Sequence, residues 1–306
     1  MTGRFRIGTR ASPLALAQTE LVVRQLHRAD PDLRIEIVPV RTSGDRTRRV
    51  TGTLDFTDEI TRRLEQGSLD AGVHSAKDLP AAPSRATKIR AYLPRADPRD
   101  CLVLRVPGRL RSLPRGARVG SSSLRRRAQL LAVRPDVEVV PIRGNIGTRL
   151  ELLGHGGLDG IVLAAAGLRR LGLSGRVSEY WPASVWLPAP GQGAIAIEAR
   201  AGDRPAERTL RSIDHRPTRL AVEAERAVVR TLGGDCELPL GAFARIRGGA
   251  VELRAALFSS DGRVRFSSGA SDSSDRAIRV GVKVGRSIRA LGDPERLVSI
   301  GGPRGR

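Results

Sequence analysis

The chain contains few of the residues on which several protein classes depend. Its 306 residues include only two cysteines, Cys101 and Cys236, too few for a disulfide framework. Four scattered histidines without paired ligand spacing predict no metal site. The longest apolar run, over residues 161–168, is far shorter than the roughly 20 residues that a membrane helix needs. Because no charged-then-apolar signal segment opens the chain, we expect a cytoplasmic protein that is not bound to a membrane.

Aromatic residues are also scarce, at 3% of the chain, which argues against stacking of single-stranded nucleic acid bases on the protein. Basic residues are abundant instead. All but three of the 53 are arginines, and the formal net charge is +21. Such a surplus predicts acidic partners, either nucleic acid or a small ligand that carries carboxylates or phosphates.

The first two thirds of the sequence is a duplication. Three pairs of segments correspond in order: 6–18 with 118–129, 34–41 with 136–143, and 67–79 with 156–168. The second pair, RIEIVPVR and DVEVVPIR, matches almost residue for residue. Each copy is typical of strand, helix, strand, loop, helix, strand, which predicts a mainly parallel sheet covered by helices on both faces. We therefore expect two α/β lobes that face each other across a cleft.

Two stretches of the second copy place five arginines where helices begin. GSSSLRRRAQL (120–130) offers serines that can cap a helix and puts Arg125 and Arg126 in its first turn, and PIRGNIGTR (141–149) follows. The helix dipole is positive there, so an arginine costs about 0.3–1 kcal/mol unless an anion occupies the same place. The pattern predicts an anion site. The alternative is that arginines fall at helix starts by chance in so arginine-rich a chain.

Apolar spacing predicts how the first of these helices faces its lobe. Leu124, Ala128 and Leu131 lie at i, i+4 and i+7, which favours a stripe turned toward the core. In the first copy the equivalent turn carries Arg10 and Ser12. Strand-to-helix turns gather at the carboxyl ends of parallel strands, where open α/β sheets bind ligands. Both lobes are therefore expected to offer arginines to one cleft.

The turn HSAKDLP (74–80) of the first copy carries Lys77 and Asp78. A solvated turn is the ordinary fate of such a pair. The duplicated turn of the second copy reads AAAGL, however, so charge is present in one copy only. An acid beside a basic cleft is suited to donate and accept a proton, or to stabilise a cationic intermediate.

The last third changes character. Residues 217–232 have helical apolar spacing, and the sequence then alternates apolar and polar residues. Hairpin signals at Gly248-Gly249 and Asp261-Gly262 interrupt this alternation. A final helix over about 273–291 would cover the resulting antiparallel sheet. These features predict a small α+β domain.

Cys236 lies on the glycine-bounded loop LGGDCELPLGAF (232–243). A buried structural thiol is the ordinary interpretation of an isolated cysteine. A loop is a poor place to bury an inert thiol, though, and a basic cleft nearby could lower its pKa. Cys101, in the apolar strand CLVLRV, fits the structural interpretation better.

Several long motifs resemble those of the porphobilinogen deaminase (hydroxymethylbilane synthase) family, in order and over nearly the whole chain. They are GTRASPLALAQ, HSAKDLP, GSSSLRRRAQL, RGNIGTRL, AAAGLRRLGL, LPAPGQGAIAIE and the loop of Cys236. The resemblance implies two lobes like those of periplasmic binding proteins, one formed by residues 1–95 with about 193–212 and the other by residues 99–190. It also implies a C-terminal α+β domain over residues 216–306, and a monomer.

The resemblance further implies an enzyme that joins four porphobilinogen molecules head to tail, with release of ammonia, to give hydroxymethylbilane. Its cofactor would be a dipyrromethane made of two substrate units and attached to Cys236 by a thioether. Asp78 would contact pyrrole nitrogens and assist deamination. The residues implied to hold the cofactor carboxylates are Lys77, Ser121, Ser123, Arg125, Arg126 and Arg149. Those implied to bind the substrate and the growing chain are Arg10, Ser12, Arg143 and Arg170.

The sequence departs from the family pattern in two places. The stretch VTGTLDFTDEI (50–60) lacks the family's usual lysines, and Asp235 stands where a glycine normally precedes the loop cysteine. A carboxylate at that position could raise the pKa of the thiol and slow cofactor attachment. The alternatives are a catalytically weakened paralogue and a two-lobed anion-binding protein without activity, which would need neither Asp78 nor Cys236. A nucleic-acid binder would need a continuous basic face.

Overall fold

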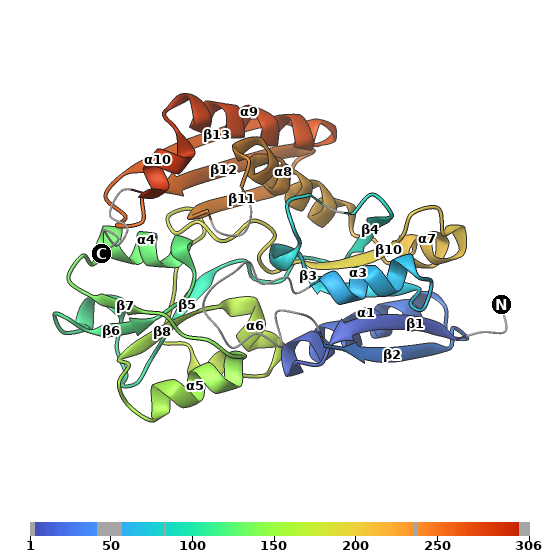
Figure 1. Cartoon of the computed structure of the whole chain (residues 1–306), viewed down its shortest axis with the longest axis horizontal. Coiled ribbons are helices and arrows are strands. Elements are labelled where there is room, and N and C mark those ends of the chain that lie inside the picture. Colours follow the sequence, from blue (N-terminus) through green and yellow to red (C-terminus); the bar gives the residue numbers. More distant parts are fainter. Residues whose placement is uncertain (1–3, 42–56, 83, 235–237, 300–306) are drawn as a thin grey trace. The chain divides into compact units, whose positions relative to one another are not determined.

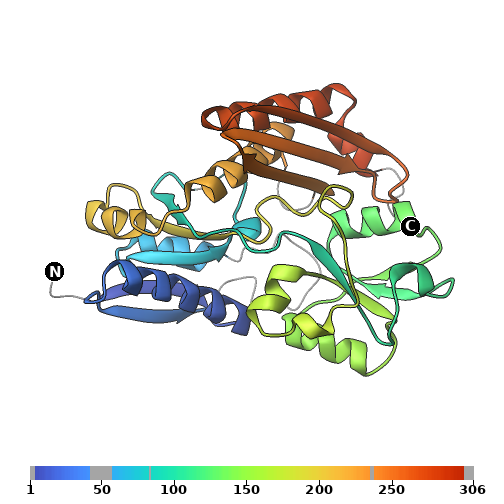
Figure 2. The same cartoon turned by 180° about the vertical axis from the view of Figure 1, so that it is seen from behind.

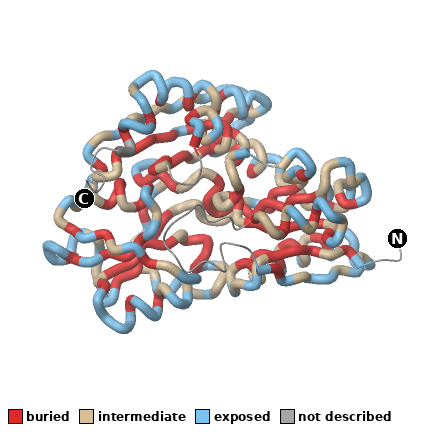
Figure 3. Tube along the Cα trace, viewed as in Figure 1, coloured by how far each residue is buried: buried red, intermediate tan, exposed pale blue. Residues whose placement is uncertain are grey.

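The computed structural model describes residues 4–41, 57–82, 84–234 and 238–299 of the chain. The chain forms two compact units. The first comprises Met1–Ala96 and Ala194–Arg219, and the second comprises Asp97–Gly193 and Leu220–Arg306. Buried residues follow the strands within each unit (Figure 3). Within the described ranges no helix is long and apolar enough to cross a membrane, and no three metal-ligating side chains gather.

The first unit is built on a five-stranded sheet with the strand order β2-β1-β3-β10-β4 (Figure 1). The strands are β1 (Phe5–Arg10), β2 (Ile35–Val40), β3 (Ala71–Ser75), β4 (Thr87–Tyr92) and β10 (Ile195–Arg200). Strand β1 is parallel to both of its neighbours, whereas β10 is antiparallel to β3 and β4. Strand β10 comes after the five strands β5 to β9 of the second unit in sequence, so the chain returns to complete the first sheet.

Helices cover both faces of this sheet. On one face, α1 (Pro13–Ala29) and α7 (Arg204–Arg211) bury Val22 and Leu210 against Ile197. On the other, α3 (Asp58–Glu65) buries Ile60 and Leu64. Helix α1 begins at Pro13, and the hydroxyl of Ser12 caps it by accepting a hydrogen bond from the Ala15 amide at 3.3 Å.

The second unit contains a sheet of the same design, with the order β7-β6-β8-β5-β9. Its strands are β5 (Asp100–Leu104), β6 (Arg118–Gly120), β7 (Glu138–Val140), β8 (Gly160–Ala164) and β9 (Glu179–Tyr180). Strand β6 is parallel to β7 and β8, and β5 is antiparallel to β8 and β9. Helix α4 (Leu124–Val133) packs on one face, and α5 (Ile146–Gly154) and α6 (Ala165–Arg170) pack on the other. The predicted α/β class with duplicated lobes is confirmed.

One polar contact is repeated in the two copies. In the first, the backbone amide of Arg6 donates to the carboxylate of Asp70 at 2.7 Å. In the second, the backbone amide of Arg118 donates to the carboxylate of Asp159 at 2.9 Å. In each copy, the contact joins the first strand, near its start, to the residue that directly precedes the third strand. The duplication seen in the sequence is therefore also a duplication of local structure.

The last part of the second unit is a three-stranded antiparallel sheet of β11 (Leu240–Arg247), β12 (Ala250–Phe258) and β13 (Arg265–Ser273). Helices α8 (Arg216–Leu232) and α9 (Ala277–Ala290) pack together on one face of this sheet (Figure 2). The predicted Gly248-Gly249 turn joins β11 to β12, with positive φ at both glycines. This is the small α+β domain that the sequence predicts.

Two details of this region were predicted wrongly. The last long helix begins at Ala277 and not at about 273, because Ser273 still pairs with Ala250 at the end of β13. The short helix α10 (Pro294–Ser299) was not predicted. It carries too few apolar residues for helical periodicity to reveal it.

A close backbone approach joins the β12–β13 hairpin to α4. Gly262 is buried, has a φ of +74°, and leaves so little room that a Cβ atom there would lie 2.1 Å from the carbonyl oxygen of Ala128. A non-glycine residue would meet both a left-handed backbone and a backbone clash. Gly248 also has a positive φ, of +55°, but its Cβ atom would meet nothing within 4 Å.

We expect Gly262→Ala to lower the free energy of unfolding more than Gly248→Ala does. The left-handed backbone costs about 1–2 kcal/mol in both variants, and the clash with α4 adds about 1–3 kcal/mol in Gly262→Ala alone. Urea unfolding followed by far-UV circular dichroism measures the difference. Equal unfolding midpoints for the two variants would contradict the close contact.

Candidate active site

The first turn of α4 carries the predicted arginine pair, and both side chains are buried. Arg125 and Arg126 are 3% and 6% exposed, whereas Leu124 is 39% exposed. The predicted core-facing stripe that began at Leu124 is therefore wrong at that residue. The serine cap is present, with the Ser123 hydroxyl accepting from the Arg126 amide at 3.4 Å.

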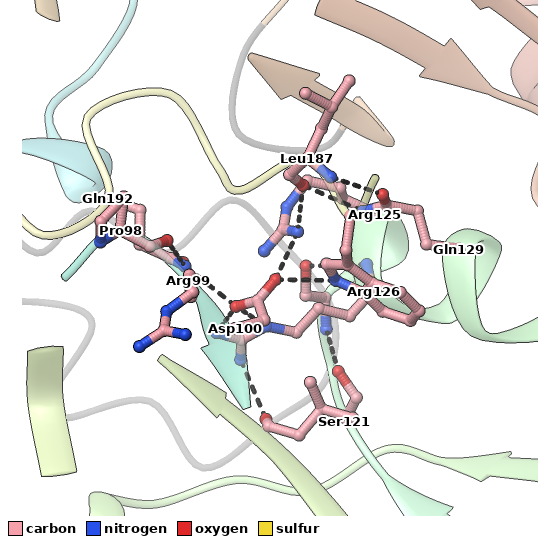
Figure 4. A network of polar contacts seen from close by, with 12 residues as sticks. Pro98, Arg99, Asp100, Ser121, Arg125, Arg126, Gln129, Leu187 and Gln192 are labelled. Carbon is pink, nitrogen blue, oxygen red and sulfur yellow. Dashed lines mark hydrogen bonds and ion pairs between the residues drawn. The ribbon is translucent and has the colours of Figure 1, made fainter. Parts of the chain in front are cut away.

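Asp100, at the first position of β5, accounts for the burial of both arginines (Figure 4). One carboxylate oxygen accepts from Arg125 Nη1 at 2.6 Å, and the other accepts from Arg126 Nη2 and Nε at 2.7 and 3.0 Å. Trp186 Nε1 and Gln192 Nε2 donate to the same carboxylate at 3.0 and 2.9 Å. We call these five residues the Asp100 cluster.

Backbone carbonyls complete the cluster. Arg125 Nη1 also donates to the carbonyl oxygen of Leu187 at 2.7 Å, and Arg126 Nη1 donates to that of Val162 at 3.0 Å. The Nε atom of Arg125 is buried without a hydrogen-bond partner in the described part of the chain. Sequence reasoning did not find Asp100, because a single acid before an apolar strand has no distinctive spacing. The structure reveals its role, because a fully buried carboxylate must be paired with cations.

The Asp100 cluster has a net positive charge. Burial disfavours the charged form of Asp100, but the two guanidinium groups overcome this effect and hold the pKa of the carboxyl far below its usual range. Burial also lowers the pKa of Arg125. One carboxylate neutralises only one of the two arginines, and the dipole of α4 adds positive potential at the same place. The cluster is therefore suited to attract a further anion.

The second arginine stretch lies beside the first. Strands β6 and β7 are parallel neighbours, and the hydroxyl of Ser122 after β6 donates to the carbonyl oxygen of Ile142 after β7. Asn145 caps α5 by accepting from the Thr148 amide at 3.0 Å. The two turns named in the sequence therefore meet at one edge of the second sheet, where open α/β sheets bind ligands.

The arginines of this second turn differ in their contacts. Arg149 Nε donates to the carbonyl oxygen of Gly144 at 2.9 Å, which holds the side chain against its own turn. No hydrogen bond or ion pair joins the Arg143 side chain to any described residue. Of the two, Arg143 keeps more of its donors available for a ligand.

Arg170 ends α6, the helix that follows β8. Its Nη2 donates to the carbonyl oxygen of Gly193 at 2.7 Å, and no carboxylate of the described residues pairs with it. Burial lowers the pKa of Arg170 to about 10. A desolvated guanidinium without an acidic neighbour is costly, and an anionic ligand would remove that cost.

In the first unit, Arg10, Ser12 and Asp78 line one cavity of about 50 Å³. Its size suits a few water-sized groups, such as one carboxylate, and not a whole pyrrole ring with its side chains. Asp78 ends the 3₁₀ turn η1 (Ala76–Asp78) directly after β3, and its side chain makes no hydrogen bond or ion pair with a described residue. Lys77 belongs to the same turn but does not line the cavity.

A buried pair that the sequence did not predict supports this turn. His74 Nε2 donates to Glu198 Oε2 at 3.0 Å, which joins β3 to β10. Burial acts to raise the pKa of Glu198, but hydrogen bonds from His74, Thr87 and Thr61 hold it below its ordinary value. The pair fixes the strand whose carboxyl end presents Asp78.

The two cysteines divide between the described and undescribed parts of the chain. Cys101 is fully buried in β5, and burial raises the pKa of its thiol to about 12. It is a structural residue, in agreement with the sequence-based interpretation. Cys236, Asp235 and residues 50–56 of the unusual loop lie outside the described residues.

We expect Asp100→Asn to lower the free energy of unfolding by about 3–5 kcal/mol, because it leaves two buried guanidinium groups without a counter-charge. The matched control is Glu252→Gln, which breaks the exposed Arg245–Glu252 pair of the same unit and costs at most about 1 kcal/mol. Chemical denaturation of both variants measures the two effects. Equal losses would show that the cluster does not constrain the fold.

The pH dependence of the free energy of unfolding gives a second test of the Asp100 cluster. Because the folded-state pKa of Asp100 is lowered, its contribution is present above the unfolded-state pKa of about 3.9 and is lost as pH falls toward the folded-state value. The stability difference between the native protein and Asp100→Asn is therefore constant above about pH 5 and declines below about pH 4.

Comparison with known proteins places these residues in a family. Residues 5–208 match the family model described as porphobilinogen deaminase, dipyromethane cofactor binding domain. Residues 219–290 match the porphobilinogen deaminase C-terminal domain. Among solved structures, a TRAP periplasmic solute binding protein from Desulfovibrio salexigens is similar, with a TM-score of 0.41 and 13% identity over 69% of this chain and 72% of that one.

Curated relatives match along nearly their whole length. The porphobilinogen deaminase of Xanthomonas axonopodis pv. citri is 43% identical over 97% of this chain and 99% of that protein. The porphobilinogen deaminase of Thermus thermophilus is 42% identical over 96% of this chain and 98% of that protein, and that of Syntrophomonas wolfei is 41% identical over 94% and 96%. The chain belongs to the porphobilinogen deaminase family.

Proposed function

We propose how the residues of this chain divide the work of the porphobilinogen deaminase reaction. The enzyme joins four porphobilinogen molecules head to tail and releases one ammonia for each, to give hydroxymethylbilane. Every pyrrole unit carries an acetate and a propionate, so negative charge accumulates as the chain of pyrroles grows. Permanently charged arginines are suited to this ligand because they pair with carboxylates in a bidentate manner.

The positive charge left without a carboxylate in buried positions supports this proposal most directly. The Asp100 cluster keeps a net charge of +1 at the start of α4, and Arg170 has no acidic neighbour among the described residues. A ligand with several carboxylates would neutralise both. The observation also favours a small polycarboxylate over nucleic acid, which would need exposed charge along a face.

The donor set fits the dipyrromethane cofactor of the family. Two pyrrole units present four carboxylates. The groups that we propose to hold them are Lys77, Ser121, Ser123, Arg125, Arg126 and Arg149. Asp100 orients Arg125 and Arg126 by occupying part of their donors, and the Nε atom of Arg125 stays unpartnered among described residues. The cofactor, attached to Cys236 by a thioether, supplies the carbon to which the first substrate unit is joined.

Arg10, Ser12, Arg143 and Arg170 are proposed to bind the carboxylates of the substrate and the growing chain. Arg10 and Ser12 line the same small cavity as Asp78, so a carboxylate bound there would lie beside the reacting acid. Arg143 has no contact to a described residue that would compete with a ligand. This division leaves Asp100 with a positioning role only.

Asp78 is the proposed catalytic residue. Its carboxylate accepts a hydrogen bond from the pyrrole N–H of the substrate. When the bond between the aminomethyl carbon and its nitrogen breaks, the electron pair leaves with ammonia, and positive charge spreads over the pyrrole ring. A carboxylate against the ring nitrogen stabilises that charge. Asp78 then accepts the proton that the new ring junction loses.

The compartment and the oligomeric state belong to the same proposal. We propose that the chain works as a cytoplasmic monomer on small pyrrole substrates, without nucleic acid. A two-lobed anion-binding protein without activity would share the arginines but would not need Asp78 or Cys236. The two experiments below distinguish these functions.

We expect the purified protein to carry an excess mass equal to two pyrrole units, which intact-mass spectrometry detects. Cys236→Ala removes the attachment point and should abolish the excess mass. The matched control is Cys101→Ala, which changes the buried cysteine and should keep it. An unmodified native protein that is also inactive with porphobilinogen would overturn the proposed function.

We expect Asp78→Ala to retain the excess mass but to lose turnover by about 10²–10⁴-fold, the range typical of a positioned acid or base. Porphobilinogen consumption under saturating substrate measures the effect. Asp32→Ala, which removes an exposed aspartate of the same unit, should leave turnover unchanged. Near-normal turnover of Asp78→Ala would remove Asp78 from the mechanism.

A further inference from the structure

The second unit contains a cavity of about 650 Å³ that none of the residues assigned above to cofactor or substrate lines. Its walls come from four parts of the unit. They are the segment 109–111, the end of α4, the segment 179–186 around β9, and the β12–β13 hairpin. A volume of this size accommodates a small organic ligand.

The inner wall is aromatic. The rings of Trp181 and Trp186 lie with their centroids 4.0 Å apart and their planes tilted by 33°, and Phe258 adds a third ring. All three side chains are buried. Val133 and Val185 stand at the cavity 60% and 75% exposed, which is a high exposure for apolar side chains. Flat rings with exposed apolar residues around them are typical of a pocket for a flat apolar ligand.

The charges at the cavity are mostly positive. Arg111 and Arg265 line it and are exposed, and their side chains make no hydrogen bond or ion pair with any described residue. Arg134 is paired with Asp136 at 2.7 Å. Glu179 is the one carboxylate among the described lining residues, and it already accepts a hydrogen bond from the Leu110 amide at 2.8 Å. The charge pattern therefore favours an anionic occupant.

We propose that this cavity is a second binding site, which takes a flat aromatic small molecule bearing a carboxylate or sulfonate. The ring system stacks against the tryptophan and phenylalanine side chains, and the anionic group pairs with Arg111 and Arg265. Guanidinium groups are suited to both tasks because they pair with oxyanions and lie against aromatic faces.

Trp186 connects this site physically to the Asp100 cluster. Its indole ring forms part of the cavity wall, and its Nε1 donates to the Asp100 carboxylate at 3.0 Å. Gln129 of α4 also lines the cavity and exchanges hydrogen bonds with Leu187, next to Trp186. An occupant therefore contacts side chains that hold the start of β5 and the first turn of α4 in place.

The composition of the chain provides a direct probe. Its only two tryptophans are Trp181 and Trp186, so intrinsic tryptophan fluorescence comes from this cavity alone. The full-length protein is titrated with 8-anilinonaphthalene-1-sulfonate, which carries a sulfonate on a flat naphthalene ring. We expect saturable quenching of the tryptophan emission with one site per chain.

Two comparisons separate recognition of the anion from general apolar binding. N-phenyl-1-naphthylamine, which lacks the sulfonate, should bind the native protein about tenfold more weakly, and tenfold corresponds to about 1.4 kcal/mol. The double variant Arg111→Ser/Arg265→Ser should bind the sulfonate about tenfold more weakly and the neutral amine unchanged. The matched control Arg208→Ser/Arg211→Ser removes two exposed arginines of the first unit and should bind both probes as the native protein does.

Three outcomes would overturn the proposal. One is equal affinity of the native protein for the two probes. Another is equal loss of sulfonate binding in the two double variants, which would indicate a general charge effect. The third is a concentration-dependent dimer in sedimentation velocity that prevents quenching, because the cavity would then be covered by a second copy of the chain.

Discussion

The buried pairing of one carboxylate with two arginines holds the second unit together around its site. Asp100 stands at the start of β5, its arginines stand at the start of α4, and Trp186 and Gln192 come from the segment that leads toward β10. Burying three charged groups is costly, so such a cluster persists only where the charges are paired in good geometry. Its residual positive charge adds to the positive potential of the helix N-terminus, so the start of α4 favours anions more strongly than the helix dipole alone would. One interaction thus determines both the local fold and the charge that the site presents.

The duplication shows which features the two copies share and which differ. Both copies keep the contact between a strand amide and a carboxylate, Arg6 with Asp70 and Arg118 with Asp159, because this contact joins the first and third strands of each sheet. The residues beyond the carboxyl ends of the strands are not constrained in this way. There the first copy carries Asp78, whereas the equivalent turn of the second copy is apolar. A shared framework therefore allows the two copies to carry different side chains at equivalent strand ends.

Most of the fold could be predicted from the sequence because its signals are local and repeated. Strand and helix periodicity, the capping serines and the Gly248-Gly249 turn each act over a few residues, and the duplication doubles their weight. The pairing of Asp100 with its two arginines could not be predicted, because the carboxylate lies 25 and 26 residues away from them in the chain and has no distinctive neighbour. The failure to predict Asp100 also explains why Leu124 was wrongly expected to face the core. Apolar spacing cannot show that a distant carboxylate buries the arginine face of α4. The family resemblance named candidate site residues, but not the groups that position them.

Burial also gives a physical reason for arginine at these positions, beyond any bias in composition. Desolvation lowers the pKa of Arg170 to about 10, which still leaves the side chain charged at neutral pH. A lysine, whose ordinary pKa of about 10.4 is closer to neutral pH, would lose its charge more readily under the same desolvation. A buried basic side chain stays charged before a ligand carboxylate binds only if its ordinary pKa lies far above neutral pH. Arginine meets this condition at Arg125 and Arg170, where burial lowers the pKa of the guanidinium group.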